Sequence, residues 1–241
     1  MDQSQISSDL NNIVQTQVLE NNANISASQT VFDYFFNASF SIKLIMLILL
    51  GASVWSWAVS ISKYMRLKFV AKQTKNFEHR FWSGVPLDIL VNEVRDTNHS
   101  PMADMFFAGM SEYQRTIKKN LNDQITNISR SMNIEIMRTE SHLSQNMSLL
   151  SFIGTNGIIV GLLGTVIGIT NVISNTQLTS AKDITPHLSE ALFTTALGLF
   201  AAIPAAFFYN YFQSAINSYL GNMETFSAEF ISIISRQTNE K

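Results

Sequence analysis

The sequence contains no cysteine, so the chain can form neither a disulfide nor a thiolate metal site. Charge is also scarce: 14% of the 241 residues are charged, compared with roughly 25% in a typical soluble domain, whereas 46% are hydrophobic. The net charge of −2 provides no basic excess that would favour a nucleic-acid partner. No Lys or Arg precedes Lys43, so the N-terminus lacks the basic region of a cleavable signal peptide. Together these shortages indicate that much of the chain lies in lipid.

The apolar residues are gathered into long runs that are free of charge. Leu44 to Ser62 is such a run, equivalent to about 28 Å of helix, which matches a hydrocarbon core of about 30 Å. A buried helix in a globular core is the alternative for this run, and two further runs of similar length make it the weaker interpretation. The sequence therefore predicts an all-α membrane protein with three transmembrane helices.

The distribution of Lys and Arg predicts the orientation. Twelve of them lie between Lys63 and Arg138, five within thirteen residues of the first span, and such residues mark the cytoplasmic side. The N-terminus is then periplasmic and the C-terminus cytoplasmic. The predicted segments are a periplasmic polar tail and approach helix at 1–38, transmembrane helix 1 at 39–62, a cytoplasmic helical domain at 63–147, transmembrane helix 2 at 148–174, a periplasmic loop at 175–185, transmembrane helix 3 at 186–212, and a cytoplasmic C-terminal helix and tail at 213–241.

Apolar residues recur every three or four positions through the cytoplasmic segment, and no Gly or Pro occurs from Met110 to Ile153. This pattern predicts long helices extending into the cytoplasm. One such helix could run without interruption into the second span, or it could break near residues 120–123. At the third span, Thr185 and Pro186 predict a helix start with Thr as N-cap and Pro at the first position. Pro204 predicts a bend unless a neighbour satisfies the freed carbonyl.

Five of the ten glycines lie on one face of the second span. They are Gly154, Gly157, Gly161, Gly164 and Gly168, and they occupy a sector of about 80° with Thr165 at its edge. Glycine inside a helix costs roughly 1 kcal/mol relative to alanine, so the pattern favours a surface for close helix packing in lipid. The third span carries a second stripe of small residues: Ala191, Thr194, Thr195, Gly198, Ala201, Ala202 and Ala205.

Few polar groups occur in these spans. Glu190 is the only acid there, and it is either a solvated charge at a helix end or a carboxyl that faces the bundle interior. Thr165 and Thr195 either bond carbonyls of their own helices or have a special role, and Asn156 favours helix–helix contact over an ion site. No His-x-x-x-His motif and no phosphate-binding loop occurs, which argues against hydrolysis and a metal site.

Several runs resemble known proteins: KLIMLILLGASVWSWA at 43–58, FWSG at 81–84, GLLGTVIGI at 161–169 and SEALFTTALGLFAAIPAAFFYN at 189–210. They are similar to the TolQ/ExbB/MotA family of proton-driven stator proteins, and the first two runs are most similar to its TolQ members. The resemblance covers about residues 31–236. The chain departs from the family pattern in its longer polar tail and at Ile167, where the family often has Trp.

The resemblance implies a pentamer in the inner membrane, with spans two and three lining a pore that holds the helices of a TolR-like dimer. An aspartate on that partner carries the proton, Thr165 and Thr195 lie near it, and Glu190 lies on the proton route or in a subunit contact. Small residues on both pore-lining helices would leave room for the partner's helix. Output passes through a TolA-like protein and supports outer-membrane integrity and constriction during cell division.

The resemblance thus implies that the chain houses the partner's helices, binds no cofactor and is not an enzyme. Three alternatives remain open at this point. The first is an autonomous proton or ion channel, although three spans do not divide into the inverted halves of many transporters. The second is an ExbB-like energiser of TonB-dependent uptake. The third is a purely structural scaffold.

Overall fold

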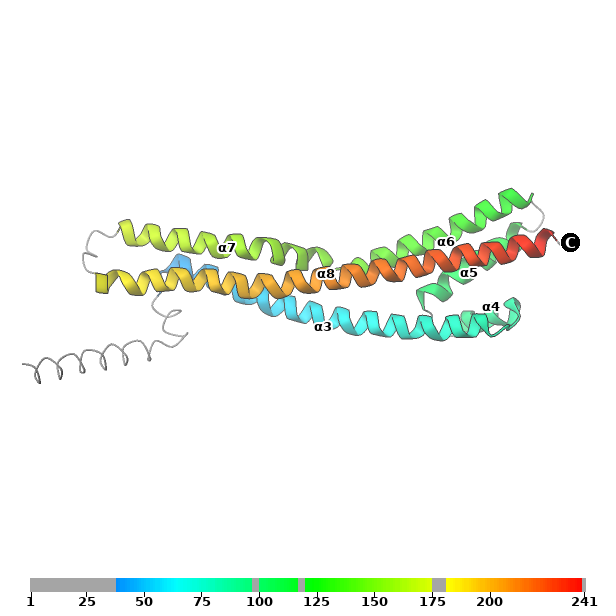
Figure 1. Ribbon diagram of the computed structural model, residues 1–241, viewed down its shortest axis with the longest axis horizontal. Helices are drawn as coiled ribbons and strands as arrows, with labels where there is room; N and C mark the ends of the chain where they lie inside the picture. Colours follow the sequence, from blue (N-terminus) through cyan, green and yellow to red (C-terminus); the bar gives the residue numbers. More distant parts are fainter. Residues whose placement is uncertain (1–37, 97–99, 117–119, 175–180, 240–241) are drawn as a thin grey trace, which may run out of the picture. The chain divides into compact units, whose positions relative to one another are not determined.

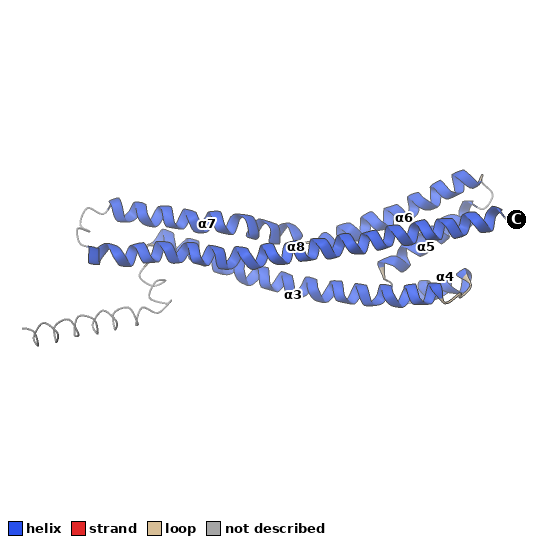
Figure 2. Cartoon of the chain, viewed as in Figure 1, coloured by secondary structure: helices blue, strands red, loops and turns tan. Residues whose placement is uncertain are grey.

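The computed structural model describes residues 38–96, 100–116, 120–174 and 181–239 (Figure 1). The regular elements of this described part are all helices (Figure 2). They are α3 (Phe40–Trp82), α4 (Leu87–Asp96), α5 (Pro101–Thr116), α6 (Leu121–Ser144), α7 (Met147–Ser174) and α8 (Ala181–Asn239). The prediction of an all-α chain is confirmed. The predicted polar tail, apart from residue 38, and residues 175–180 of the predicted loop lie outside the described residues.

Three helices are long and apolar enough to cross a membrane: Phe40–Trp82, Met147–Ser174 and Ile184–Arg236. Their apolar side chains are widely exposed, as at Val54 (71%) and Ile173 (76%). A soluble protein rarely exposes such a large apolar surface, whereas lipid tails cover it without cost. The predicted number of spans is therefore confirmed, while their direction stays a prediction.

The chain forms two compact units, and each long helix contributes to both. The first unit comprises the described residues of 1–51 together with residues 157–200. Its small core consists of Ala38, Ile42 and Met46, against which Phe193 and Leu197 pack. Within this unit, Gly161, Gly164 and Gly168 of α7 face small residues of α8.

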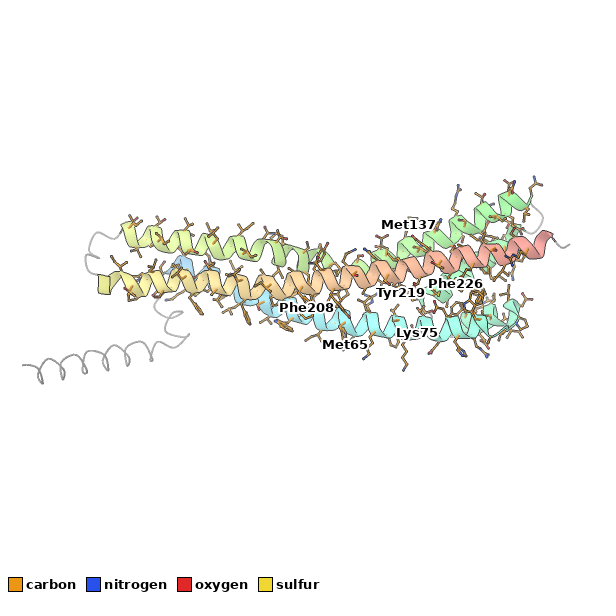
Figure 3. The ribbon with its side chains drawn as sticks, viewed as in Figure 1. Met65, Lys75, Met137, Phe208, Tyr219 and Phe226 are labelled. Carbon is orange, nitrogen blue, oxygen red and sulfur yellow. The ribbon has the colours of Figure 1, made fainter. Side chains whose placement is uncertain are left out.

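The second unit, residues 52–156 and 201–241, has a larger core rich in phenylalanine. Phe81 of α3 lies at its centre, with its ring 4.8 Å from that of Phe226 on α8 and 5.8 Å from that of Phe106 on α5. Nearby, the hydroxyls of Thr74 and Tyr219 share a buried hydrogen bond of 2.8 Å. Figure 3 labels Tyr219 and Phe226 on α8. Aromatic packing thus joins α3, α5 and α8 within this unit.

A tight turn returns the chain from α3 into α4. Gly84 adopts a φ of +78°, which suits glycine because it has no Cβ. Arg80 of α3 then pairs with Glu93 of α4, and its Nε donates a hydrogen bond of 3.1 Å to Glu93 Oε2. The Arg80 guanidinium holds the pKa of the Glu93 carboxyl below its usual value. Because the pair is exposed, it fixes the turn more than it stabilises the fold.

Of the two alternatives for the cytoplasmic segment, the structure excludes one continuous helix running into the second span. α5 ends at Thr116 and α6 begins at Leu121, in agreement with the alternative of a break near 120–123. A second break separates α6 from α7, where Asn146 adopts a φ of +62° (Figure 1). Asparagine tolerates this left-handed conformation better than most residues.

A lysine from α3 stabilises the second break. Lys63 Nζ donates hydrogen bonds of 2.7 Å to the carbonyl of Leu143 and 2.6 Å to that of Gln145. These carbonyls lose their helical partners where α6 ends, and a charged donor satisfies them. Sequence periodicity gave no sign of this contact, because Lys63 lies about eighty residues earlier in the chain.

The helix start predicted at Thr185 and Pro186 is wrong, whereas the membrane bounds of the third span stay a prediction. α8 begins at Ala181, so Pro186 lies in its second turn, and the helix continues through Pro204 to Asn239. The missing N–H of Pro186 removes one bond close to an end where the helix already has unbonded N–H groups. No separate C-terminal helix follows the span; the same helix contributes Phe226 and Phe230 to the aromatic core.

Candidate functional site

The glycine stripe of α7 is buried, and it faces α8 of the same chain. A Cβ added to Gly161 would lie 3.1 Å from the Cα of Gly198 and 3.2 Å from the Cα of Thr195. One added to Gly164 would collide with the Thr194 side chain, and one added to Gly168 would collide with Ala191. Only glycine permits this separation of the two backbones.

Gly154 shows the same relation within the second unit. A Cβ there would lie 2.9 Å from the backbone nitrogen of Ala206. The small residues of α8 that meet the stripe are themselves buried, including Ala191, Thr194 and Gly198. The two stripes therefore pack against each other. This arrangement differs from the expectation that a partner's helix would fill the space beside both stripes.

Two threonine hydroxyls meet at the edge of this contact. Thr165 Oγ1 and Thr195 Oγ1 are hydrogen-bonded to each other, and both lie within hydrogen-bond reach of the Gly161 carbonyl, at 3.3 Å and 3.0 Å respectively. Both side chains are half-buried. The bond of Thr165 to its own helix, expected as one alternative, occurs here together with a bond between helices. The missing side chain at Gly161 leaves room for the cluster.

The number of protons limits what this cluster can do. Two hydroxyls have two protons, and one arrangement uses both: Thr195 donates to the Gly161 carbonyl while Thr165 donates to Thr195. The free lone pairs of Thr165 can then accept a hydrogen bond from an incoming group. A protonated carboxylic acid can donate such a bond, whereas an ionised carboxylate needs a donor and must break a bond of the cluster. The arrangement thus favours the protonated form of an approaching acid.

Glu190 lies elsewhere in the first unit, and it is not a solvated charge at a helix end. It is the tenth residue of α8, and only 3% of its surface is exposed. Its Oε2 lies 3.6 Å from His187 Nδ1 and has no hydrogen-bond partner among the described residues. Both side chains line a cavity of about 240 Å³ together with Ser39 and Asn171, which are hydrogen-bonded to each other.

The other polar residues of the spans have local partners. Asn156 Nδ2 donates to the carbonyl of Phe152 in its own helix at 3.0 Å, and the expected role of Asn156 in helix–helix contact stays a prediction. Thr194 is fully buried and donates to the carbonyl of Glu190 at 3.0 Å. Within the described ranges, no group of three His, Asp or Glu side chains could hold a metal ion.

Sequence reasoning missed two residues of interest. One is His187, whose position three residues before Glu190 places the two on one helix face. Lys63 was seen only as a charge that marks the end of the first span. Its contact with the α6–α7 break has no counterpart in local sequence pattern.

Comparison of the sequence with known proteins identifies a family and several relatives. Residues 97–225 match the MotA/TolQ/ExbB proton channel family. The chain is 32% identical to the Tol-Pal system protein TolQ of Pseudomonas aeruginosa, over 90% of this chain and 97% of the relative. It is 31% identical to TolQ of Haemophilus influenzae, over 88% and 97%. It is 27% identical to the biopolymer transport protein ExbB of Pseudomonas putida, over 85% and 63%.

These matches include both stripes, the threonine cluster and Glu190. They agree with three membrane-spanning helices and with a protein that is not an enzyme. The chain belongs to the MotA/TolQ/ExbB proton channel family.

Proposed function

We propose that this chain is the inner-membrane stator subunit of a Tol-Pal motor driven by the proton-motive force. Two TolQ proteins match it at 31–32% identity over nearly their whole lengths, compared with 27% for the ExbB of Pseudomonas putida. On this proposal the chain houses a TolR-like helix pair and passes energy to a TolA-like protein. The output supports outer-membrane integrity and constriction during division.

The proposed assembly is a pentamer whose second and third spans surround the partner helices. Because the glycine and alanine stripes pack on each other, the pore is lined by the edge of the α7–α8 contact, where Thr165 and Thr195 lie. Five copies then present a ring of hydroxyl pairs at one height. Five sites facing two partner helices cannot all be satisfied at once, so each proton transfer moves the partner to a new position.

The threonine cluster is the observation on which the proposed mechanism depends. The partner's acid docks on the cluster when it is protonated, because the cluster has free acceptors and no free donor. Loss of the proton leaves a carboxylate that the cluster binds less well, and the acid moves away. One charge that crosses 100 mV releases about 2.3 kcal/mol, which exceeds the worth of one such hydrogen bond, about 0.6 to 2 kcal/mol.

Valine substitutions test this mechanism. Thr165→Val and Thr195→Val keep the shape of the side chain and remove the hydroxyl, so each should abolish resistance to deoxycholate and large antibiotics. Thr195→Ser keeps a hydroxyl and should retain much of the function. Thr170→Val is the matched control, because Thr170 is exposed and bonds only the Val166 carbonyl of its own helix in the described structure.

The readout must separate motor failure from assembly failure. Co-purification of the TolR-like protein should be unchanged in the Thr165 and Thr195 variants. Full function of both valine variants would refute the mechanism and favour a purely structural scaffold. Loss of function in the Thr170 control would show that the effect is not specific to the Thr165 and Thr195 cluster.

The second candidate function is an ExbB-like energiser, favoured by the matches to ExbB proteins. Deletion of the gene separates the two. Sensitivity to detergent supports the Tol-Pal function, and failure to use iron chelates supports TonB-dependent uptake. An autonomous channel predicts proton conductance from the purified chain alone in vesicles, where the proposed stator needs its partner.

A further inference from the structure

A second polar cavity lies in the other unit, at the end of the first span and beside the α6–α7 break. It encloses about 260 Å³, and its eight lining residues include two cations, Lys63 and Arg66, and no carboxylate. Arg66 is exposed, while Lys63 is 6% exposed. Two neighbouring positive charges without an acid in the same cavity disfavour each other unless an anion joins them.

Lys63 retains capacity to bind an anion. Its ammonium group has three protons, of which two bond the Leu143 and Gln145 carbonyls. The third is available, and the Arg66 guanidinium adds a fork of donors that suits a phosphate group. Gln145 and Asn146 also line the cavity.

Three further lining residues are apolar. Trp55, Ala58 and Val59 precede Lys63 on α3, within the apolar run that forms the first span. The Trp55 side chain is 59% exposed, as is usual for tryptophan at a membrane interface. The cavity thus has a cationic end where the span ends and an apolar end within the span.

The geometry points to a binding site for an anionic phospholipid, with the phosphate between Lys63 and Arg66 and an acyl chain along Val59 and Trp55. Basic pockets between membrane helices bind anionic headgroups in this way. A free phosphate shares the headgroup chemistry, but it would leave the apolar lining uncovered. The bound lipid would brace the α6–α7 break through Lys63. The proposed lipid site does not depend on which partner protein the chain binds.

Native mass spectrometry of the full chain in detergent tests the site, with phosphatidylglycerol and phosphatidylcholine as probes. We expect phosphatidylglycerol to bind more tightly than phosphatidylcholine. Arg66→Gln should weaken phosphatidylglycerol binding about fivefold, the effect of about 1 kcal/mol for one basic residue at a membrane surface. Arg66→Lys should restore most of the affinity. Lys72→Gln, which removes an exposed charge of α3 outside the cavity, should leave it within twofold.

Three results would overturn the proposal. Equal affinity for the two lipids would show that the headgroup charge is not recognised. Equal losses in the Arg66→Gln and Lys72→Gln variants would indicate diffuse attraction to the helix surface. Displacement of phosphatidylglycerol by millimolar inorganic phosphate would indicate a free-anion site. Because Arg66 is exposed, its variants should unfold at the wild-type temperature, which the same samples can confirm.

Discussion

The contact between Gly198 and α7 allows one substitution to be worked out in detail. A Cβ at position 198 would lie 2.7 Å from the Gly157 carbonyl oxygen and 2.9 Å from the Gly161 Cα. Ordinary contacts begin near 3.4 Å, and both opposing atoms belong to a helix backbone that cannot rotate away. Gly198→Ala must therefore push α7 and α8 apart by about 0.7 Å.

That displacement has two measurable consequences. Overpacking of a close contact costs about 1 to 3 kcal/mol, which exceeds the gain of about 1 kcal/mol or less from replacing glycine in a helix. The bond of 3.0 Å from Thr195 to the Gly161 carbonyl would lengthen to about 3.7 Å, beyond hydrogen-bond range. Gly198→Ala should thus reduce both stability and function.

Gly221→Ala is the matched control. Gly221 lies in the same helix, and an added Cβ there meets nothing within 4 Å. This variant should be as stable as the wild type or more stable by up to about 1 kcal/mol. The assays are thermal unfolding of the purified protein in detergent and survival of cells on deoxycholate. Equal unfolding temperatures for the Gly198→Ala and Gly221→Ala variants would refute the claim that backbone contact requires glycine at position 198.

Two further predictions concern the α6–α7 break. Asn146→Ala should cost about 1 to 2 kcal/mol of unfolding free energy because alanine disfavours a positive φ, whereas Asn146→Gly should cost little. Lys63→Met should cost about 1 to 3 kcal/mol because the buried Leu143 carbonyl loses its charged donor, and Lys63→Arg should recover part of the loss. Thermal unfolding in detergent measures all four variants.

Different results would contradict these two predictions. An Asn146→Ala variant as stable as the Asn146→Gly variant would mean that α6 and α7 join without a left-handed residue. A fully stable Lys63→Met variant would mean that water, and not the ammonium group, satisfies the two carbonyls. A surface lysine such as Lys75 provides the control for loss of charge.

The three spans could be predicted because apolar runs are bounded by charge, and this pattern depends only on local sequence. The face of α7 with five glycines was equally clear from periodicity. Periodicity shows that a face exists but not what covers it, and so the packing of Gly161 and Gly168 on α8 could not be read from the sequence.

The remaining features depend on contacts between residues far apart in the sequence, which local pattern does not reveal. Lys63 bonds the carbonyls at the break before Asn146, and the position of Glu190 in α8 follows from where that helix begins. Local rules placed that start at Thr185, and the extra turn of helix before it moves Glu190 away from the helix end. The pairing of Thr165 with Thr195 needed the helix register, which no spacing within either helix reveals.

The arrangement of ionisable groups has a consequence for a cell that makes this protein. Glu190 and His187 stand at one end of the third span, and residues 191–212 contain no Asp, Glu, His, Lys or Arg. The hydroxyls of Thr165 and Thr195 bind protons too firmly to conduct them alone. On the proposed function, copies without a partner should therefore conduct no protons across the membrane, so surplus synthesis would not discharge the proton gradient.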